Sequence, residues 1–139
     1  MMIAEAVMGL ALNVYHEARS QSLVEQIAVA QVVINRVNDE RYPDTVCGVV
    51  KQGEKNPDGS MKEDRCQFSW YCDGIKDTPY NKDAWELALS VAKSVHAGHT
   101  VEITGGATHY HATSVNPFWA KTLKKVTRIG KHIFYRWEK

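Results

Sequence analysis

The chain lacks a long hydrophobic run and a strong excess of charge. No segment approaches the roughly 20 uninterrupted apolar residues that a membrane-spanning helix requires, so we expect no stable membrane insertion. The 17 lysines and arginines against 16 aspartates and glutamates give a formal net charge of +1, which provides no general attraction to nucleic acid. Residues 1–12 are apolar but lack a basic start and include Glu5, which argues against a cleavable signal peptide.

Cysteine is also scarce. Cys47, Cys66 and Cys72 form no Cys-x-x-Cys pair, which excludes the spacing of zinc ribbons and dithiol redox motifs. One disulfide with one free thiol, and three reduced thiols, both remain open. The chain has 139 residues, 44% of them hydrophobic, and it shows no repeat or long linker. We therefore expect one domain over residues 1–139 with a single core, and a monomer.

Two long helices have clear end signals. The first of them, over residues 23–38, opens with the capping-box pattern Ser22-x-x-Glu25, in which Ser22 can accept from the amide of Glu25 and Glu25 can reach back. The second covers residues 82–97, and Gly98 is placed as its stop.

The remaining elements are predicted to be short. Residues 45–51 can form a short helix, whereas residues 52–61 consist of turn-forming residues and predict a surface loop. The late chain predicts an extended segment over 105–111, a short helix opened by Asn116 as N-cap with Pro117, and a hairpin of 126–129 with 132–137. The fold class expected is α+β, mostly α-helical, with a small antiparallel β-sheet late in the chain.

Glu17 occupies an unusual position for a carboxylate. It ends an apolar helical stripe whose members are Ile3, Val7, Leu10 and Val14. The stripe that buries this first helix would also draw Glu17 out of bulk water. Desolvation raises the pKa of a glutamic acid from about 4.3 toward 6, where it can still donate a proton near neutrality. The alternative is a boundary glutamate capped by Arg19 or His16.

Other chemistries fit the spacing less well. A zinc-peptidase helix motif starting at His16 requires a histidine at position 20, which is Ser20. His109 and His111 would lie on one side of a strand, where they could chelate a metal with His132 or a cysteine. A cysteine nucleophile would pair Cys66 or Cys72 with one of those two histidines. Structural roles are favoured for these groups, and we expect no metal and no cofactor.

A glycosidase needs an acid together with side chains that hold sugar rings. Aromatic residues of the right kind are Phe68, Trp70, Tyr71, Tyr110, Trp119 and Tyr135. Hydrogen-bonding groups are supplied by Gln67, Ser69, His111 and Asn116. Each alone is more often a core or loop residue, so the set supports Glu17 without proving a site.

Several blocks, read in order, make the chain recognisable. They are His16-Glu17-Ala18-Arg19, residues 26–37, Tyr42-Pro43-Asp44-Thr45-Val46-Cys47-Gly48, residues 66–74, Ala107-Thr108-His109-Tyr110-His111, and residues 129–136. Together they resemble the SleB/CwlJ-type cell wall hydrolases over nearly the whole chain. The family's usual Glu-Ala-Arg-Gly-Glu is here Glu17-Ala18-Arg19-Ser20-Gln21, so the second acidic residue is absent.

The resemblance implies a lysozyme-like fold that acts on the bond between N-acetylmuramic acid (MurNAc) and N-acetylglucosamine (GlcNAc) in peptidoglycan. Glu17 falls at the position of the family's catalytic glutamate. The substrate-binding residues predicted around it are Gln67, Phe68, Ser69, Trp70, Tyr110, His111 and Asn116.

The product depends on what captures C1 of the muramoyl ring. A hydrolase needs a second carboxylate, for which the candidates are Asp44, Asp64, Asp73 and Asp77. A lytic transglycosylase needs none, and this is the reading we favour. A non-catalytic glycan-binding module is the alternative of another class. The absence of a signal peptide and of a wall-binding domain suggests a phage endolysin held in the host cytoplasm until a holin releases it; the alternative location is the periplasm or cell wall.

Overall fold

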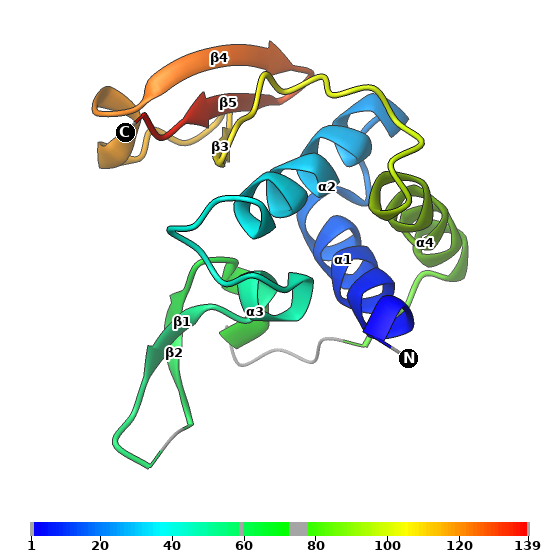
Figure 1. The fold of residues 1–139 in the computed structure, drawn as a ribbon, viewed down its shortest axis with the longest axis horizontal. Helices are drawn as coiled ribbons and strands as arrows, with labels where there is room; N and C mark the ends of the chain where they lie inside the picture. Colours follow the sequence, from blue (N-terminus) through cyan, green and yellow to red (C-terminus); the bar gives the residue numbers. More distant parts are fainter. Residues whose placement is uncertain (1, 59, 73–77, 139) are drawn as a thin grey trace.

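A computed structural model describes the backbone of residues 2–58, 60–72 and 78–138, and the side chains of these residues except 2–3, 54, 62–65, 69 and 72. Four α-helices form the body: α1 (Met2–Ala18), α2 (Leu23–Val37), α3 (Val46–Val50) and α4 (Lys82–His96). Helix α1 packs against the other three. Figure 1 shows the helices grouped together, a three-stranded sheet beside α2, and a two-stranded hairpin projecting near α3.

The helix ends follow the chemistry of their caps. Ser22 accepts a hydrogen bond from the Glu25 amide at 3.2 Å, and α2 stops at its C-cap Asn38. Asn81 caps α4 in the same way, and Gly98 follows its end with a φ of 76°. The boundaries predicted for both helices are therefore confirmed to within a residue.

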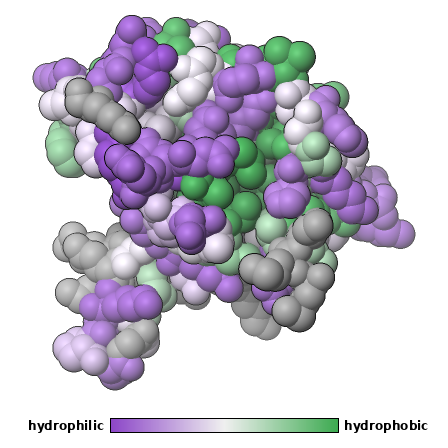
Figure 2. All heavy atoms as spheres, in the orientation of Figure 1, coloured by the Kyte–Doolittle hydropathy of each residue, from purple (hydrophilic) through white to green (hydrophobic). Residues whose placement is uncertain are grey.

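The main core lies between the helices. Its wholly buried members on α1 include Leu10, Val14 and Tyr15, so Leu10 and Val14 of the predicted stripe face inward as expected. Val7 is partly buried against the same core, and the side chain of Ile3 lies outside the described residues. Figure 2 shows apolar side chains gathered in the middle of one face of the molecule, over α1 and α2. Among the described residues, no helix is both long enough and apolar enough to cross a membrane.

The late sheet consists of β3 (His109–Ala112), β4 (Lys124–Ile129) and β5 (His132–Arg136), in the order β3-β5-β4 with antiparallel pairing. The predicted hairpin and the α+β class are thus confirmed, although β4 begins two residues earlier than the pattern suggested. Strand β3 lies at the edge of the sheet and pairs His109 with Tyr135 and His111 with Ile133.

A second, smaller core joins this sheet to α2. It consists of Ala28 and Val32 from the helix with Ala107 and Phe134 from the sheet side. Polar side chains of α2 reinforce the contact, because Asn35 donates to the Ala107 carbonyl at 2.9 Å. The segment that leads into β3 is therefore held against α2 by both packing and hydrogen bonds.

Two predictions of local structure were wrong. Residues 52–61 are not simply a loop, because β1 (Gly53–Lys55) pairs with β2 (Met61–Cys66) in an irregular hairpin. The turn-rich composition belongs to the tip and to a very short strand, which leaves little alternating pattern to read. The second error concerns the short helix, which is a 3-10 turn, η2 (Phe118–Lys121), preceded by Pro117 without a side-chain cap.

The turn between β4 and β5 gives a stability prediction. Gly130 has a φ of 57°, and a β-carbon there would collide with the buried Glu25 carboxylate. We expect Gly130→Ala to lower the free energy of unfolding by about 3 kcal/mol or more, because backbone strain of about 1 to 2 kcal/mol adds to disruption of a buried charge. Denaturant unfolding measures the loss.

Gly98→Ala is the matched control. Its φ of 76° carries the same backbone strain, yet nothing lies within 4 Å of the added β-carbon. We expect a loss of only about 1 kcal/mol. Equal losses for the two variants would contradict the role given to the Glu25 contact.

Candidate active site

Glu17 lies in the last turn of α1 and is only partly exposed. The hydroxyl of Tyr110, on β3, donates a hydrogen bond to Glu17 Oε1 at 2.5 Å. Tyr110 was predicted only as a sugar-binding residue, so its direct contact with the candidate acid is new. This bond ties the first helix to the late sheet at the carboxylate itself.

The environment raises the pKa of Glu17. Burial is the largest cause, and it outweighs the lowering by the Tyr110 hydrogen bond and by the positive charges of His132, His16 and Arg36. The predicted direction of the shift is therefore confirmed. A carboxylic acid with a raised pKa stays protonated closer to neutrality, which suits a proton donor.

Arg36 is a buried cation near this carboxylate, and its side chain is 4% exposed. Its Nε donates to the Thr108 carbonyl at 2.7 Å, and its guanidinium lies 5.0 Å from the Tyr42 ring centroid and 5.1 Å from that of Phe68. Burial leaves the pKa of Arg36 below its usual value, although Tyr42, Tyr110 and Glu17 act to raise it. Arg36 therefore provides a positive charge where a Glu17 anion would form.

His132 provides a second polar neighbour through a buried ion pair. Its Nδ1 lies 3.0 Å from Glu25 Oε2, and its ring meets the Tyr110 ring edge-on at 5.5 Å. Burial raises the pKa of Glu25, but the hydrogen bonds from His132, the Lys131 amide and Ser22 leave it lowered overall. Glu25 does more than the capping box predicted, since it holds His132 against Tyr110.

The contacts of Arg19 do not match the alternative in which it caps the Glu17 carboxylate. Arg19 donates to the Tyr15 hydroxyl at 3.0 Å, and its guanidinium lies 4.4 Å from the Tyr80 ring centroid. His16 stacks on Trp70 at 4.8 Å. The Arg19 guanidinium is therefore engaged on the far side of Tyr15 rather than on the carboxylate.

The predicted residues of the 66–74 block divide by burial. Gln67 is exposed, and its Oε1 accepts from Arg36 at 3.5 Å. Phe68 and Trp70 are nearly buried: Phe68 packs toward Tyr110, and Trp70 donates to Asn13 at 2.8 Å. Phe68 and Trp70 therefore pack beneath the surface, and the side chain of Ser69 lies outside the described residues. Contact of these four residues with substrate stays a prediction.

His111 and Asn116 lie further along the same late segment. The ring of His111 uses both nitrogens, with Nε2 2.8 Å from the Tyr135 hydroxyl and Nδ1 2.7 Å from the Ala112 carbonyl. Asn116 is exposed just before η2. As predicted, His109 and His111 share one side of their strand, since both rings lie against Trp119. The binding roles of His111 and Asn116 stay predictions.

The structure bears on the cysteine nucleophile, the metal site and the second carboxylate. Cys47 is free and Cys66 is disulfide-bonded, so Cys66 offers no thiolate nucleophile. Among the described residues, no group of three or more histidine, cysteine, aspartate or glutamate side chains could hold a metal ion. Asp44 lines a hollow with Val46 and His96. The other three carboxylate candidates, Asp64, Asp73 and Asp77, lie outside the described side chains.

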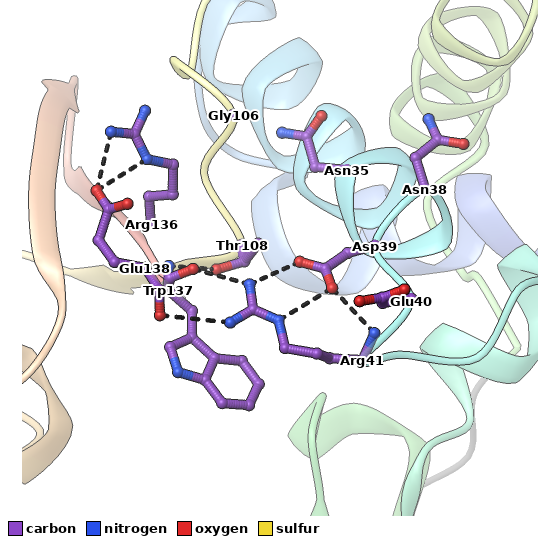
Figure 3. Close-up of a pocket in the computed structure, with 10 residues that line it drawn as sticks. All are labelled: Asn35, Asn38, Asp39, Glu40, Arg41, Gly106, Thr108, Arg136, Trp137 and Glu138. Carbon is purple, nitrogen blue, oxygen red and sulfur yellow. Dashed lines mark hydrogen bonds and ion pairs between the residues drawn. The ribbon is translucent and has the colours of Figure 1, made fainter.

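A hollow of about 730 Å³ does not contain Glu17 (Figure 3). Two ion pairs lie along it: Arg41 contacts Asp39 at 2.7 Å, and Arg136 contacts Glu138 at 2.9 Å. Glu17, whose pKa is raised by burial, lies outside this hollow.

Sequence reasoning missed Arg36 and His132 as groups that act on Glu17, and Glu25 as the partner of His132. Arg36 carried a usable signal, because it is a charge on a helix that is otherwise apolar nearly all round. Glu25 was explained locally by its capping box, and His132 was considered structural. No spacing rule connects either residue with position 17.

Comparison with known proteins identifies the family of this chain. The model of the Cell Wall Hydrolase family matches residues 20–135. The spore cortex-lytic enzyme of Halalkalibacterium halodurans is 32% identical over 127 residues, covering 90% of this chain and 33% of that protein. The chain thus spans about a third of the length of this curated relative.

Two solved structures are similar throughout the chain. The catalytic domain of the germination-specific lytic transglycosylase SleB from Bacillus anthracis has a TM-score of 0.67 and 27% identity, covering 94% of this chain and 93% of that one. The catalytic domain of the Bacillus cereus SleB protein has a TM-score of 0.66 and 28% identity, with coverages of 96% and 91%. The resemblance read from the sequence blocks is confirmed, and the chain belongs to the Cell Wall Hydrolase family.

Proposed function

We propose that this chain cleaves the MurNAc-GlcNAc β-1,4 bond of peptidoglycan as a lytic transglycosylase. The observation that carries the proposal is Glu17, a partly buried acid with a raised pKa that accepts a hydrogen bond from Tyr110. The likeness to a SleB lytic transglycosylase supports the reaction class. The family match begins at residue 20, so the role of Glu17 rests on its geometry and on the sequence resemblance.

In the first step Glu17 acts as a general acid. Its carboxyl proton passes to the glycosidic oxygen, the bond from that oxygen to C1 of the muramoyl ring breaks, and positive charge develops on the ring. Glu17 becomes a carboxylate. The Tyr110 hydroxyl and the charges of Arg36 and His132 all favour that anion, so they stabilise the state in which the proton has left.

In the second step the muramoyl 6-hydroxyl attacks C1. The Glu17 carboxylate takes the hydroxyl proton, which forms a 1,6-anhydro ring and restores the acid. No water is consumed, and no second carboxylate is needed. One side chain therefore serves as acid and then as base in the same turnover.

The alternative is a hydrolytic muramidase. Such an enzyme needs a second carboxylate about 5 to 9.5 Å from the first, depending on its stereochemistry. Among the described residues, the groups with the largest effects on the pKa of Glu17 are a tyrosine, two histidines and an arginine. The likeness to a SleB lytic transglycosylase favours the reaction that needs no second carboxylate. A pure binding module is disfavoured because binding alone gives no reason to desolvate an acid.

The expected substrate is the peptidoglycan glycan strand, and the expected place of action is the cell wall or spore cortex, as the name of the related spore cortex-lytic enzyme suggests. That relative gives no support to the phage endolysin stored in a host cytoplasm. We also infer that residues 1–139 act as one catalytic domain and as a monomer. Size-exclusion chromatography with light scattering tests the oligomeric state.

Glu17→Gln tests the assignment of the acid. The exchange keeps the shape of the side chain but removes its proton, so we expect the release of fragments from purified sacculi to fall at least a hundredfold. Mass spectrometry of fragments from the unaltered protein reads the product: anhydro ends support the transglycosylase, and reducing ends mean a hydrolase. Near-normal lysis by the variant would rule out Glu17.

The same variant should change the dependence of stability on pH. Because the folded-state pKa of Glu17 is raised above 4.5, its contribution to stability is full below that value and is lost as the pH rises through the folded-state pKa. We expect Glu17→Gln to be more stable than the unaltered protein at pH 8, with a smaller difference at pH 4. Denaturant unfolding at both values measures this, and a constant difference would count against a raised pKa.

Tyr110→Phe tests the hydrogen bond. Because that bond favours the charged form, its removal should raise the pKa of Glu17 further and move the alkaline limb of the pH-activity profile upward. Loss of one hydrogen bond to a charged group, about 1.5 to 3 kcal/mol, should lower the rate by about ten- to a hundredfold.

Tyr135→Phe is the matched control for this test. It removes a buried hydroxyl from the same sheet, but that hydroxyl bonds to His111 rather than to Glu17. We expect its alkaline limb to stay in place. If both variants leave the limb unmoved, Tyr110 does not set the protonation of the acid.

A further inference from the structure

A separate hollow of about 380 Å³ lies beside the exposed residue Gln67, and the chemical steps at Glu17 do not use it. Its lining consists of Cys66, Gln67, His109, Trp119, Leu123 and Trp137. The volume falls in the range of small-ligand sites, about 300 to 1,000 Å³. Two indoles and a leucine supply the apolar part of its wall, and polar groups that include an amide and an imidazole supply at least as much.

Trp119 is held rigidly at this hollow. Its ring meets Tyr135 edge-on at 5.3 Å, His111 at 5.7 Å and His109 at 5.2 Å, from strands β5 and β3. The side chain is nevertheless only half-buried. A flat aromatic surface that is already fixed loses little conformational entropy when a ligand packs on it.

Trp137 forms another part of the wall and is fixed from behind. The Arg41 guanidinium lies 4.0 Å from its ring centroid, and Arg41 Nη2 donates to the Trp137 carbonyl at 2.8 Å (Figure 3). Asp39 holds the same guanidinium at 2.7 Å. The indole is still 42% exposed, which leaves surface for a ligand.

The described residues that line the hollow carry no charge at neutral pH. Burial, with the positive charges of Arg36 and Arg41, lowers the pKa of His109 to about 4, so its ring is neutral at pH 7, with Nδ1 2.9 Å from Thr108 Oγ1. Cys66 is disulfide-bonded. A neutral ligand with an apolar face and several hydroxyl or amide groups matches this chemistry, whereas a charged peptide does not.

Two contacts link the lining of the hollow to the surroundings of Glu17. Gln67 lines it and accepts from Arg36, whose charge acts on Glu17. His109 and Tyr110 are neighbours on β3, the edge strand, so one strand borders the hollow on one face and the acid on the other. A polymer lying across this edge would reach both places.

We propose that this hollow is an accessory subsite that binds one N-acetylhexosamine ring of the glycan strand, away from the bond that is cleaved. The carbohydrate ring stacks its apolar face on Trp119, and Gln67 and His109 bond its hydroxyl or acetamido groups. The choice of occupant rests on the proposed function. The site adds affinity for longer strands and takes no part in proton transfer.

Binding to glycan strands freed of their peptide stems by an amidase tests the subsite. Calorimetry is carried out in the Glu17→Gln background, in which cleavage is removed. We expect Trp119→Ala to raise the dissociation constant about five- to tenfold. Phe118→Ala is the matched control: Phe118 is the preceding residue on η2, is 88% exposed and does not line the hollow. Its affinity should be unchanged. Equal affinities for the two variants would overturn the proposal.

Leu123→Arg keeps the test valid if loss of Trp119 impairs folding. It fills the hollow from its wall while leaving the ring contacts of Trp119, so the same loss of affinity is expected. With Glu17 unchanged, Trp119→Ala and Leu123→Arg should each raise KM and leave kcat within about twofold. The reason is that a remote subsite contributes equally to the ground state and the transition state. A fall in kcat alone would contradict the assignment.

Two comparisons separate failure of the subsite from failure of the proposed function. If the unaltered protein releases no fragments from sacculi but still binds strands through Trp119, the hollow stands and the enzyme activity fails. If it cleaves sacculi while Trp119→Ala binds as Phe118→Ala does, only the subsite fails. Competition by free stem peptides, rather than by stem-free strands, would show that the occupant is wrong.

Discussion

The hydrogen bond from Tyr110 to Glu17 joins the helical body to the late sheet at the carboxylate proposed as the acid. The partners are 93 residues apart, so the bond exists only if β3 is held at the end of α1. The small core of Val32, Ala107 and Phe134 attaches the sheet to α2, and α2 packs against α1. The position of the acid thus depends on packing that is remote from it, and a shift of the sheet would be felt first at the carboxylate.

The charges around Glu17 are arranged asymmetrically. Glu25 and His132 are both buried, but they pair with each other, and Arg36 is held by a carbonyl and two aromatic rings. Glu17 instead accepts from a neutral hydroxyl. Burial therefore dominates its pKa while positive charges remain near enough to act on the anion. This combination holds the proton in the resting state and lowers the cost of releasing it, which an ion pair in direct contact would not do.

The sequence predicted those features that depend on local chemistry. Helices α2 and α4 were predicted because Ser22 and Glu25 form a capping box and Gly98 is placed as the stop of α4, and the raised pKa of Glu17 followed from its stripe. The β1–β2 hairpin was missed because a three-residue strand with an irregular register has no readable alternation. Arg36 and His132 were missed because their effect on Glu17 arises from tertiary packing, on which spacing along the chain carries no information, and the same holds for the pairing of Glu25 with His132.

Strand β3 shows how few residues can serve two tasks. Alternation along its four residues directs Tyr110 toward the acid, while His109 and His111 lie against Trp119 on the opposite face. Because β3 is an edge strand, it pairs with β5 on one side only within the described sheet. A slip of one residue in its pairing with β5 would exchange the two faces, removing the hydroxyl from Glu17 and the rings from Trp119 together. The hydrogen-bond partner of Glu17 and the rings that pack on Trp119 are therefore positioned by the same register.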